Sequence, residues 1–455
     1  MSMISINPAT GEKIQEYPEM SREEVASIVA AVGQRFSDWR RTSFAERAQR
    51  MRRTAELLRQ RRESYAQLMT QEMGKTIRDS RNEIEKCAWV CEYYAEHAEA
   101  FLSREDAHTE ARNSFVSYQP LGVILAVMPW NFPFWQFFRF AAPALMAGNC
   151  SVLKHSSNVT GSALAIEQLL QEAGYPENVF RTLVIGSPGV ADVIRHPAVA
   201  AVTLTGSTPA GRAIASTAGE QLKPCVLELG GSDPYIVLED ADLEHAARTC
   251  VMSRLFNAGQ SCIAAKRFVV VSSVADEFEQ LVVEEMKTRV MGDPMDETSQ
   301  VGSQARRDLR DELHEQVQQS IEAGAVCLLG GDVPAGPGAF YPPTVLSRVE
   351  RGMPAYDDEL FGPVAAIIRA TDEAEAIGIA NDSFFGLGAA VFTRDVERGT
   401  RIAEQEIEAG CVFVNEHVRS DPRMPFGGIK GSGFGRELSS FGIREFVNVK
   451  GIWVG

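Results

Sequence analysis

Cys262 is the residue of this sequence best suited to covalent chemistry. It ends the segment Asn257–Cys262 (NAGQSC), which we expect to lie at the end of a helical stretch. A cysteine attacks as the thiolate, whereas the alternative interpretation is a small buried apolar side chain. The histidine signature of a cysteine protease does not follow this segment, so the pattern does not favour a Cys–His hydrolase.

Glu228 and Asn131 have the chemistry to assist such a nucleophile. Glu228 lies in Val226–Leu229, where apolar neighbours should bury the carboxyl group, raise its pKa and make it a general base near neutral pH. The alternative for Glu228 is an ion pair with a nearby Lys or Arg. Asn131 lies in the rigid turn Pro129–Pro133 (PWNFP), where its amide can donate to a developing oxyanion or instead bond to the turn backbone.

Two further segments are suited to a phosphate or a ribose. Gly206–Gly211 (GSTPAG) opens a predicted helix, where glycine permits close approach and free N–H groups attract phosphate. It is neither a P-loop nor a G-x-G-x-x-G motif. Lys154 follows another apolar run and would face a ligand crevice; the alternative is a solvated lysine, with Ser156 or Ser157 as a helix N-cap.

Short apolar runs that alternate with helical segments must position these residues. The runs are Gly122–Met128, Ser151–Leu153, Leu183–Ile185, Val199–Leu204 and Val226–Leu229. Strands that alternate with helices predict a parallel sheet, and ligands of such sheets bind at the carboxyl ends of the strands. Because the candidate residues follow or end these runs, we expect them to meet at one sheet edge.

Helical and α/β patterns lie on either side of this region. Ser21 with Glu24 and Ser43 with Glu46 predict capping boxes at the starts of N-terminal helices. A second α/β stretch runs from about residue 234 to 425. Its predicted elements are the strands Pro234–Leu238, Arg267–Val271 and Val364–Ile368 and a helix from Asp276 to about Met291. A C-terminal strand, Phe446–Val454, is predicted after this stretch.

Length and charge narrow the class of protein. The 455 residues suggest about three structural units, and 45 basic against 61 acidic residues give a net charge of −16. Such a surface disfavours binding to nucleic acid or to an anionic membrane. We expect a cytoplasmic protein without signal peptide or membrane span, and no metal site, since Cys87 and Cys91 fit core positions best.

Seven motifs in order resemble those of the aldehyde dehydrogenase superfamily, and most closely its short bacterial succinate semialdehyde dehydrogenases. The resemblance covers nearly the whole chain. Its motifs are Pro129–Pro133, Lys154, Gly206–Ser207, Glu228–Gly231 (ELGG), Gly259–Cys262 (GQSC), Glu359–Pro363 (ELFGP) and Pro425–Gly428 (PFGG).

The resemblance implies an α/β fold with three parts. A Rossmann-like dinucleotide-binding domain would comprise residues 1–106 and 123–233, and a second α/β catalytic domain residues 234–425. A small β extension for oligomerisation would combine residues 107–122 and 436–455. The resemblance also implies a homodimer or a homotetramer.

The same resemblance implies the reaction. The Cys262 thiolate would attack an aldehyde, and the Asn131 amide with the Cys262 N–H would hold the oxyanion. Hydride would pass to a nicotinamide, and Glu228 would activate the water that hydrolyses the thioester to a carboxylate.

Nine residues are implied in cofactor binding. Lys154 and Glu359 would bind the riboses, Ser207 the pyrophosphate, and Phe361 would pack near the nicotinamide ribose. Ser157 stands where many NAD-preferring relatives carry a glutamate, so we expect NADP to be accepted and favoured over NAD. The full set is Trp130, Lys154, Ser157, Gly206, Ser207, Leu229, Gly230, Glu359 and Phe361.

The predicted substrate is succinate semialdehyde. Arg139 and Ser420 resemble the carboxylate clamp of succinate semialdehyde dehydrogenases, and Trp135 and Ser261 are further substrate candidates. Arg139 has the alternative of a helix-surface ion pair, and Trp135, like Phe256, that of a core position. Alternative functions are oxidation of glutarate semialdehyde or of a hydrophobic aldehyde, a non-catalytic binding role, and thioester hydrolysis without nicotinamide.

Overall fold

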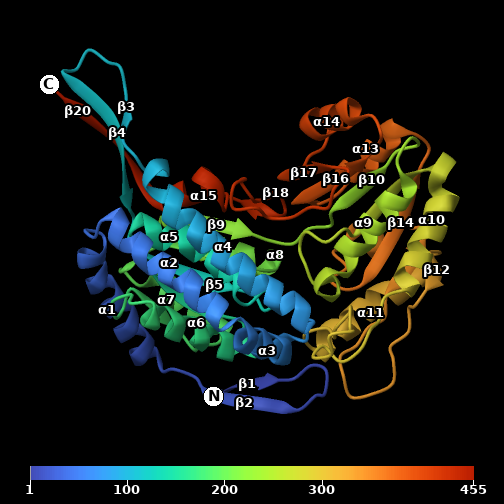
Figure 1. The fold of residues 1–455 in the computed structure, drawn as a ribbon, viewed down its shortest axis with the longest axis horizontal. Coiled ribbons are helices and arrows are strands. Elements are labelled where there is room, and N and C mark those ends of the chain that lie inside the picture. The colour runs from blue at the N-terminus through green and yellow to red at the C-terminus, as the bar shows by residue number, and fades with distance from the viewer. Residues whose placement is uncertain (1) are drawn as a thin grey trace.

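A computed structural model describes residues 2–455 of the chain. Two large sheets flanked by helices form its body (Figure 1). In the first sheet, of order β19-β9-β8-β5-β6-β7, all strands are parallel except the edge strand β19. Its strands are β5 (Val123–Met128), β6 (Cys150–His155), β7 (Phe180–Thr182), β8 (Val199–Thr205), β9 (Cys225–Glu228) and β19 (Gly433–Phe434).

The second sheet has the order β12-β13-β14-β11-β10-β16-β17, and its strands are parallel except β12. The predicted parallel sheets are therefore confirmed. Its strands are β10 (Pro234–Val237), β11 (Arg267–Val271), β12 (Val326–Leu329), β13 (Thr344–Ser347), β14 (Val364–Ala370), β16 (Gly388–Phe392) and β17 (Cys411–Val414).

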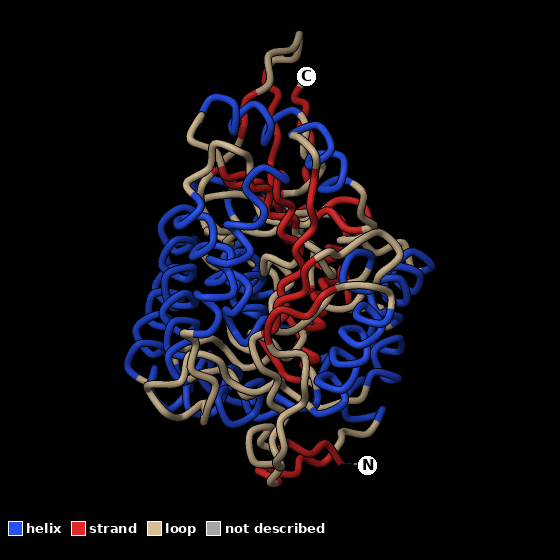
Figure 2. The backbone as a smooth tube through the Cα atoms, turned by 90° about the vertical axis from the view of Figure 1, so that its right-hand side faces the viewer, coloured by secondary structure: helices blue, strands red, loops and turns tan. Residues whose placement is uncertain are grey.

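Helices lie on both sides of the strands, as the turned view in Figure 2 shows. The capping boxes predicted at Ser21 and Ser43 are both present. Helices before residue 234 are α1 (Arg22–Trp39), α2 (Phe44–Gln60), α3 (Arg62–Met73), α4 (Ile77–Phe101), α5 (Trp135–Ala147), α6 (Thr160–Glu172), α7 (Val190–Arg195) and α8 (Thr208–Glu220). Later helices are α9 (Leu243–Leu255), α10 (Ser272–Lys287), α11 (Arg307–Glu322), α12 (Pro354–Asp357), α13 (Glu373–Asn381), α14 (Val396–Gln405) and α15 (Ser439–Arg444).

Helix α5 is the most deeply placed of these elements. All of its residues are buried, as expected of a helix that is almost apolar on every face. It packs against α4 and against strands β5 and β6. Because α5 begins just after the Pro129–Pro133 turn, its position determines where Asn131 lies.

Small sheets extend the body. Strands β4 (Asn113–Pro120) and β20 (Val447–Val454) pair along their whole length and project outward, with the C-terminus at the tip (Figure 1). Strand β3 (Glu105–Asp106) pairs with β4. The other pairs are β1 (Ser2–Ile6) with β2 (Lys13–Pro18), and β15 (Phe385–Gly386) with β18 (Ile429–Lys430).

Two sequence-based boundaries are wrong. Leu183–Ile185 is not a strand, because β7 ends at Thr182 and the buried apolar residues that follow lead into the turn before α7. The helix predicted from Asp276 to Met291 begins at Ser272, directly after β11, and ends at Lys287. None of the helices within residues 2–455 combines the length and apolar composition needed to cross a bilayer.

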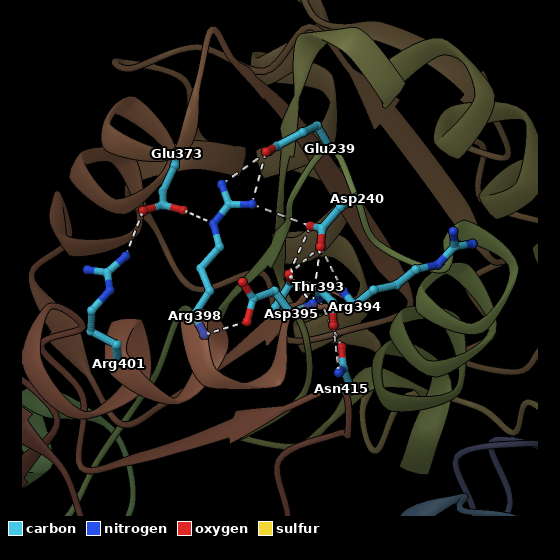
Figure 3. Close-up of polar contacts among 9 residues, drawn as sticks. All are labelled: Glu239, Asp240, Glu373, Thr393, Arg394, Asp395, Arg398, Arg401 and Asn415. Atoms are coloured by element: carbon cyan, nitrogen blue, oxygen red, sulfur yellow. Dashed lines mark hydrogen bonds and ion pairs between the residues drawn. The ribbon is translucent and has the colours of Figure 1, made fainter.

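An ionic network connects the carboxyl ends of β10 and β16 in the second sheet (Figure 3). Asp240, just after β10, accepts hydrogen bonds from the Thr393 hydroxyl at 2.8 Å and from the N–H groups of Arg394 and Asp395 at 3.0 and 3.2 Å. Arg398 of α14 pairs with Glu239, Asp240 and Glu373. The network therefore holds β10, β16, α13 and α14 together.

We expect Asp240→Asn to destabilise the protein by about 2 kcal/mol, the scale of hydrogen bonds to a charged group. Burial raises the pKa of Asp240, but the hydrogen bonds from Thr393 and the two N–H groups outweigh it and lower the pKa below its ordinary value. The difference from wild type in thermal unfolding should thus be full above about pH 4 and vanish as the pH falls through this pKa. Glu404→Gln, at an exposed site on α14, is the control; an equal loss there would contradict the assignment.

Candidate active site

The predicted strand-end residues lie on four neighbouring strands. In the register of the first sheet, Val127 of β5 lies opposite Lys154 of β6 and Leu204 of β8, and Thr205 of β8 lies opposite Glu228 of β9. The side chains that follow these strands therefore meet at one edge, as the sequence predicted. The segment that follows β9 at this edge leads to β10 of the second sheet.

A cavity of about 280 Å³, here named the strand-end cavity, lies at this edge and is also lined by residues of α11. Asn131 and Cys262 both line it. Seven of the nine predicted cofactor residues also line it: Trp130, Gly206, Ser207, Leu229, Gly230, Glu359 and Phe361. Lys154 and Ser157 do not line this cavity.

Lys154 is only 8% exposed at the end of β6, so its alternative as a solvated lysine is wrong. Burial lowers the pKa of its amine. Ser157 is exposed, and its hydroxyl bonds to no residue in the described part of the chain. The Ser157 hydroxyl is therefore available to a ligand.

The start of α8 fits a phosphate group. Ser207 is the N-cap residue, but its side chain makes no capping bond, so the first N–H groups of α8 keep their donor capacity. A Cβ placed on Gly206 would have no neighbour closer than 3.7 Å, which leaves room in front of these donors. The residues present thus fit a dinucleotide.

The Cys262 segment does not end a helix as predicted. The 3₁₀ turn Phe256–Gly259 follows α9, and inside it Asn257 and Ala258 have left-handed backbone angles, with φ of 55° and 53°. Asn257 stabilises this turn by donating to the carbonyl oxygens of Asn131 and Gln260 at 2.9 and 3.0 Å. The turn thereby connects the Cys262 segment to the Asn131 turn.

Lys266 fixes the backbone of Cys262. Its buried amine donates to the carbonyl oxygens of Ser261 and Cys262 at 2.9 and 2.7 Å. Glu359 lies 3.3 Å from the same amine and accepts a hydrogen bond from the Gly231 N–H. Sequence reasoning missed Lys266, although its place four residues after Cys262 was an available signal.

Burial raises the pKa of the Cys262 thiol to about 12, and the nearby cations Arg139 and Lys266 offset only part of this effect. The thiol is thus protonated at neutral pH and needs a base before it can attack. Asn131 is 4% exposed and donates from Nδ2 to the Gln260 carbonyl at 3.1 Å. Its amide therefore bonds to the cysteine segment and not to its own turn.

Glu228 is buried, and neither carboxyl oxygen has a hydrogen-bond partner among residues 2–455. Burial and the neighbouring carboxyl of Glu437 raise its pKa well above the ordinary value. The Glu228 side chain lies against Gly427, where an added Cβ would be 2.7 Å from the Oε1 atom of Glu228. Glu228 lines neither the strand-end cavity nor the second cavity that contains Cys262, which is described next. No Lys or Arg of the described chain pairs with it, so the predicted alternative of an ion pair is wrong.

A second cavity, here named the inner cavity, lies on the other side of Cys262. It has a volume of about 110 Å³. The predicted substrate residues Trp135, Arg139, Ser261 and Ser420 all line it, as does Phe256. It shares residues with an outer cavity of about 590 Å³, which includes Arg419 and Arg423.

Arg139 is 2% exposed and forms a buried ion pair with Glu437. It also donates to the Thr205 hydroxyl at 3.1 Å. The alternative interpretation predicted an ion pair at the protein surface. The ion pair is present, but it is buried. Contact of Arg139 with a substrate stays a prediction, and its charge is already balanced by Glu437.

Glu83 of α4 holds the start of α5 in place. Its carboxylate accepts hydrogen bonds from the N–H groups of Phe134 and Trp135 at 2.8 and 2.9 Å and pairs with the buried Lys75. Sequence reasoning missed Glu83 and Lys86 because a lone charge on an amphipathic helix gives no signal, and it missed Lys75 in the short connection between α3 and α4. Within residues 2–455, no cluster of His, Cys, Asp or Glu is arranged to hold a metal ion.

Comparisons with known proteins show the family of the chain. The model of the aldehyde dehydrogenase family matches residues 1–452. A probable succinate-semialdehyde dehydrogenase [NADP(+)] of Synechocystis is 50% identical, with all of both chains covered. A succinate semialdehyde dehydrogenase [NAD(P)+] of Escherichia coli is 48% identical over 99% of this chain and 97% of its own. The structure of succinic semialdehyde dehydrogenase from Streptococcus pyogenes with NADP+ has a TM-score of 0.97, 37% identity and 99% coverage of both chains.

The raised pKa of Cys262 gives a test of the site. Alkylation of this thiol by iodoacetamide should accelerate about tenfold per pH unit from about pH 7 to 9, because the thiolate fraction grows by that factor below the pKa. Peptide mass spectrometry measures the rate at Cys262, with the half-buried Cys327 as internal control. A rate at Cys262 that is independent of pH would show that the thiol is already ionised.

Proposed function

The chain belongs to the aldehyde dehydrogenase family, and we propose that it oxidises succinate semialdehyde to succinate with NADP as the preferred cofactor. The observation that carries this proposal is the position of one residue. Of the residues that the structure describes, Cys262 alone lines both the strand-end cavity and the inner cavity. A nucleophile between two cavities suits a reaction in which one ligand gives hydride to another.

In the proposed reaction, the Cys262 sulfur forms a bond to the aldehyde carbon and the thiol proton is lost to a base. The negative charge that develops on oxygen is stabilised by Asn131 Nδ2 and the Cys262 N–H. A bound nicotinamide supplies the acceptor for the hydride whose departure leaves a thioester on Cys262. Water activated by Glu228 then releases the carboxylic acid product and restores the thiol.

Glu228 must turn from Gly427 toward Cys262 to do this work. The absence of hydrogen bonds to its oxygens from the described residues supports such a movement, because no protein bond has to break. Its raised pKa supports a role as proton acceptor near neutral pH. The observed position of the Glu228 side chain is therefore a resting position in the proposed reaction.

The cofactor preference rests on Ser157 and on the relatives. An exposed hydroxyl can donate to a 2′-phosphate, whereas a carboxylate at this place would repel it. The relatives from Synechocystis and Streptococcus pyogenes are named or described with NADP. The N–H groups of α8 would hold the pyrophosphate, with Lys154 and Glu359 at the riboses.

A homodimer or homotetramer is part of the proposal. The projecting sheet of β3, β4 and β20 supports it, because β20 exposes the large apolar side chains of Val449 and Trp453. Exposed apolar side chains on a projecting strand suit contact with a second copy.

Steady-state kinetics with a panel of aldehydes tests the proposal. The wild type should show its highest kcat/KM with succinate semialdehyde, and Cys262→Ser should lower kcat by about 10⁴ or more because the nucleophile is lost. Cys327→Ser is the matched control and should behave like wild type. Full turnover of the Cys262→Ser variant would contradict the mechanism.

Replacing Ser157 tests the cofactor preference. Ser157→Glu should lower the ratio of kcat/KM for NADP to that for NAD by about tenfold or more, because like charges would meet at the 2′-phosphate. Ser157→Ala should lower this ratio less, since it removes a donor without adding charge. A ratio unchanged by the glutamate would show that residue 157 does not face the ribose.

A further inference from the structure

Lys86 lies where the inner and outer cavities meet. It comes from α4 and is one of five residues shared by the linings of these two cavities, with Phe256, Ser261, Ile263 and Ser420. Its amine donates to the Ser420 hydroxyl at 2.8 Å and lies 4.3 Å from the centre of the Trp135 ring. These contacts hold a cation at the passage that leads to Cys262.

The charge of Lys86 is not balanced by a carboxylate, in contrast to the arginines around it. Arg139 pairs with Glu437, Arg419 with Glu416 at 3.1 Å, and Arg423 with Asp421 at 2.6 Å. No carboxylate within residues 2–455 lies at ion-pair distance from Lys86. Among the cations of the two cavities, it is thus the one whose charge an anionic ligand can still neutralise.

We propose that the Lys86 amine, with the Ser420 hydroxyl, binds the carboxylate of the aldehyde substrate and makes the enzyme specific for aldehydes with an anionic far end. This inference rests on the proposed function and assigns the charge recognition to a residue that sequence reasoning missed. With the carboxylate at Lys86, the aldehyde end would extend through the inner cavity to Cys262. A half-buried ammonium in such a place forms a strong charge-assisted hydrogen bond.

The ionisation of Lys86 makes the assignment testable without a variant. Burial and the charge of Arg139 on α5 lower the pKa of the amine to about 8, while Glu83 and Cys87 on α4 and Asp421 in the C-terminal loop oppose this effect. The charge is therefore present below this pKa and lost as the pH rises through it. For wild type, KM for succinate semialdehyde should rise about tenfold from about pH 7 to 9, and KM for butanal should not.

Two variants complete the experiment, both assayed with succinate semialdehyde and with butanal, an uncharged aldehyde of equal chain length. Lys86→Met should lower kcat/KM for succinate semialdehyde about 30-fold, mainly through KM, and change that for butanal by less than about threefold. Lys86→Arg should retain activity on succinate semialdehyde and remove the pH dependence of KM. Arg423→Met, which removes a neutralised charge from the outer cavity, is the matched control and should change neither substrate by more than about twofold.

The outcomes separate the two proposals. If wild type oxidises succinate semialdehyde well but Lys86→Met reduces both aldehydes equally, or neither, the Lys86 assignment is overturned and the proposed function stands. A wild-type KM for succinate semialdehyde that does not change with pH also overturns the assignment, even if the methionine variant fails to fold. A wild type that oxidises butanal but not succinate semialdehyde overturns both proposals.

Discussion

The buried carboxylate of Glu83 is the contact on which the geometry of the site depends. Helix α5 starts inside the protein without a capping side chain of its own, and unsatisfied N–H groups there would be costly. Glu83 accepts from two of them, and Lys75 balances its charge. Because Asn131 lies in the turn that leads into α5, the Glu83–Lys75 ion pair holds the proposed oxyanion donor in place.

The Cys262 segment is held by contacts of its own, one of which reaches the Asn131 turn. Asn257 and Lys266 use their side chains to bind main-chain oxygens of the two reacting segments. Gly259, with φ of 76°, packs so tightly against the Gly362 carbonyl that a side chain there would clash. The proposed nucleophile thus lies on a backbone held by several contacts, whereas the Glu228 carboxyl group makes no hydrogen bond to the described residues.

The parts of this structure that sequence could predict are those governed by local periodicity. Alternating apolar runs located the strands, and parallel strands necessarily bring residues such as Asn131 and Glu228 to one edge. The strand predicted at Leu183–Ile185 is wrong because an apolar run indicates burial and does not indicate pairing with a neighbouring strand. The left-handed turn at Asn257 was missed because neither Asn257 nor Ala258 is a glycine.

Long-range charge pairs lay beyond the reach of sequence. Arg139 looked like a free cation because its partner, Glu437, comes from the far end of the chain and reaches α5 only in the folded protein. Lys86 gave no signal in the sequence for the opposite reason, since only the fold shows that no carboxylate accompanies it. Whether a cation is available to a ligand depends on the pairing of all its neighbours, which is a property of the tertiary structure.

The half-buried, protonated state of the Cys262 thiol has a consequence for its reactivity toward oxidants. Peroxides react with thiolates and convert them to sulfenic and then sulfinic acids, the second of which is not readily reversed. A sulfur whose pKa is raised to about 12 offers such reagents very little anion between turnovers. The same desolvation that would delay the proposed attack on a carbonyl therefore protects this thiol against irreversible oxidation.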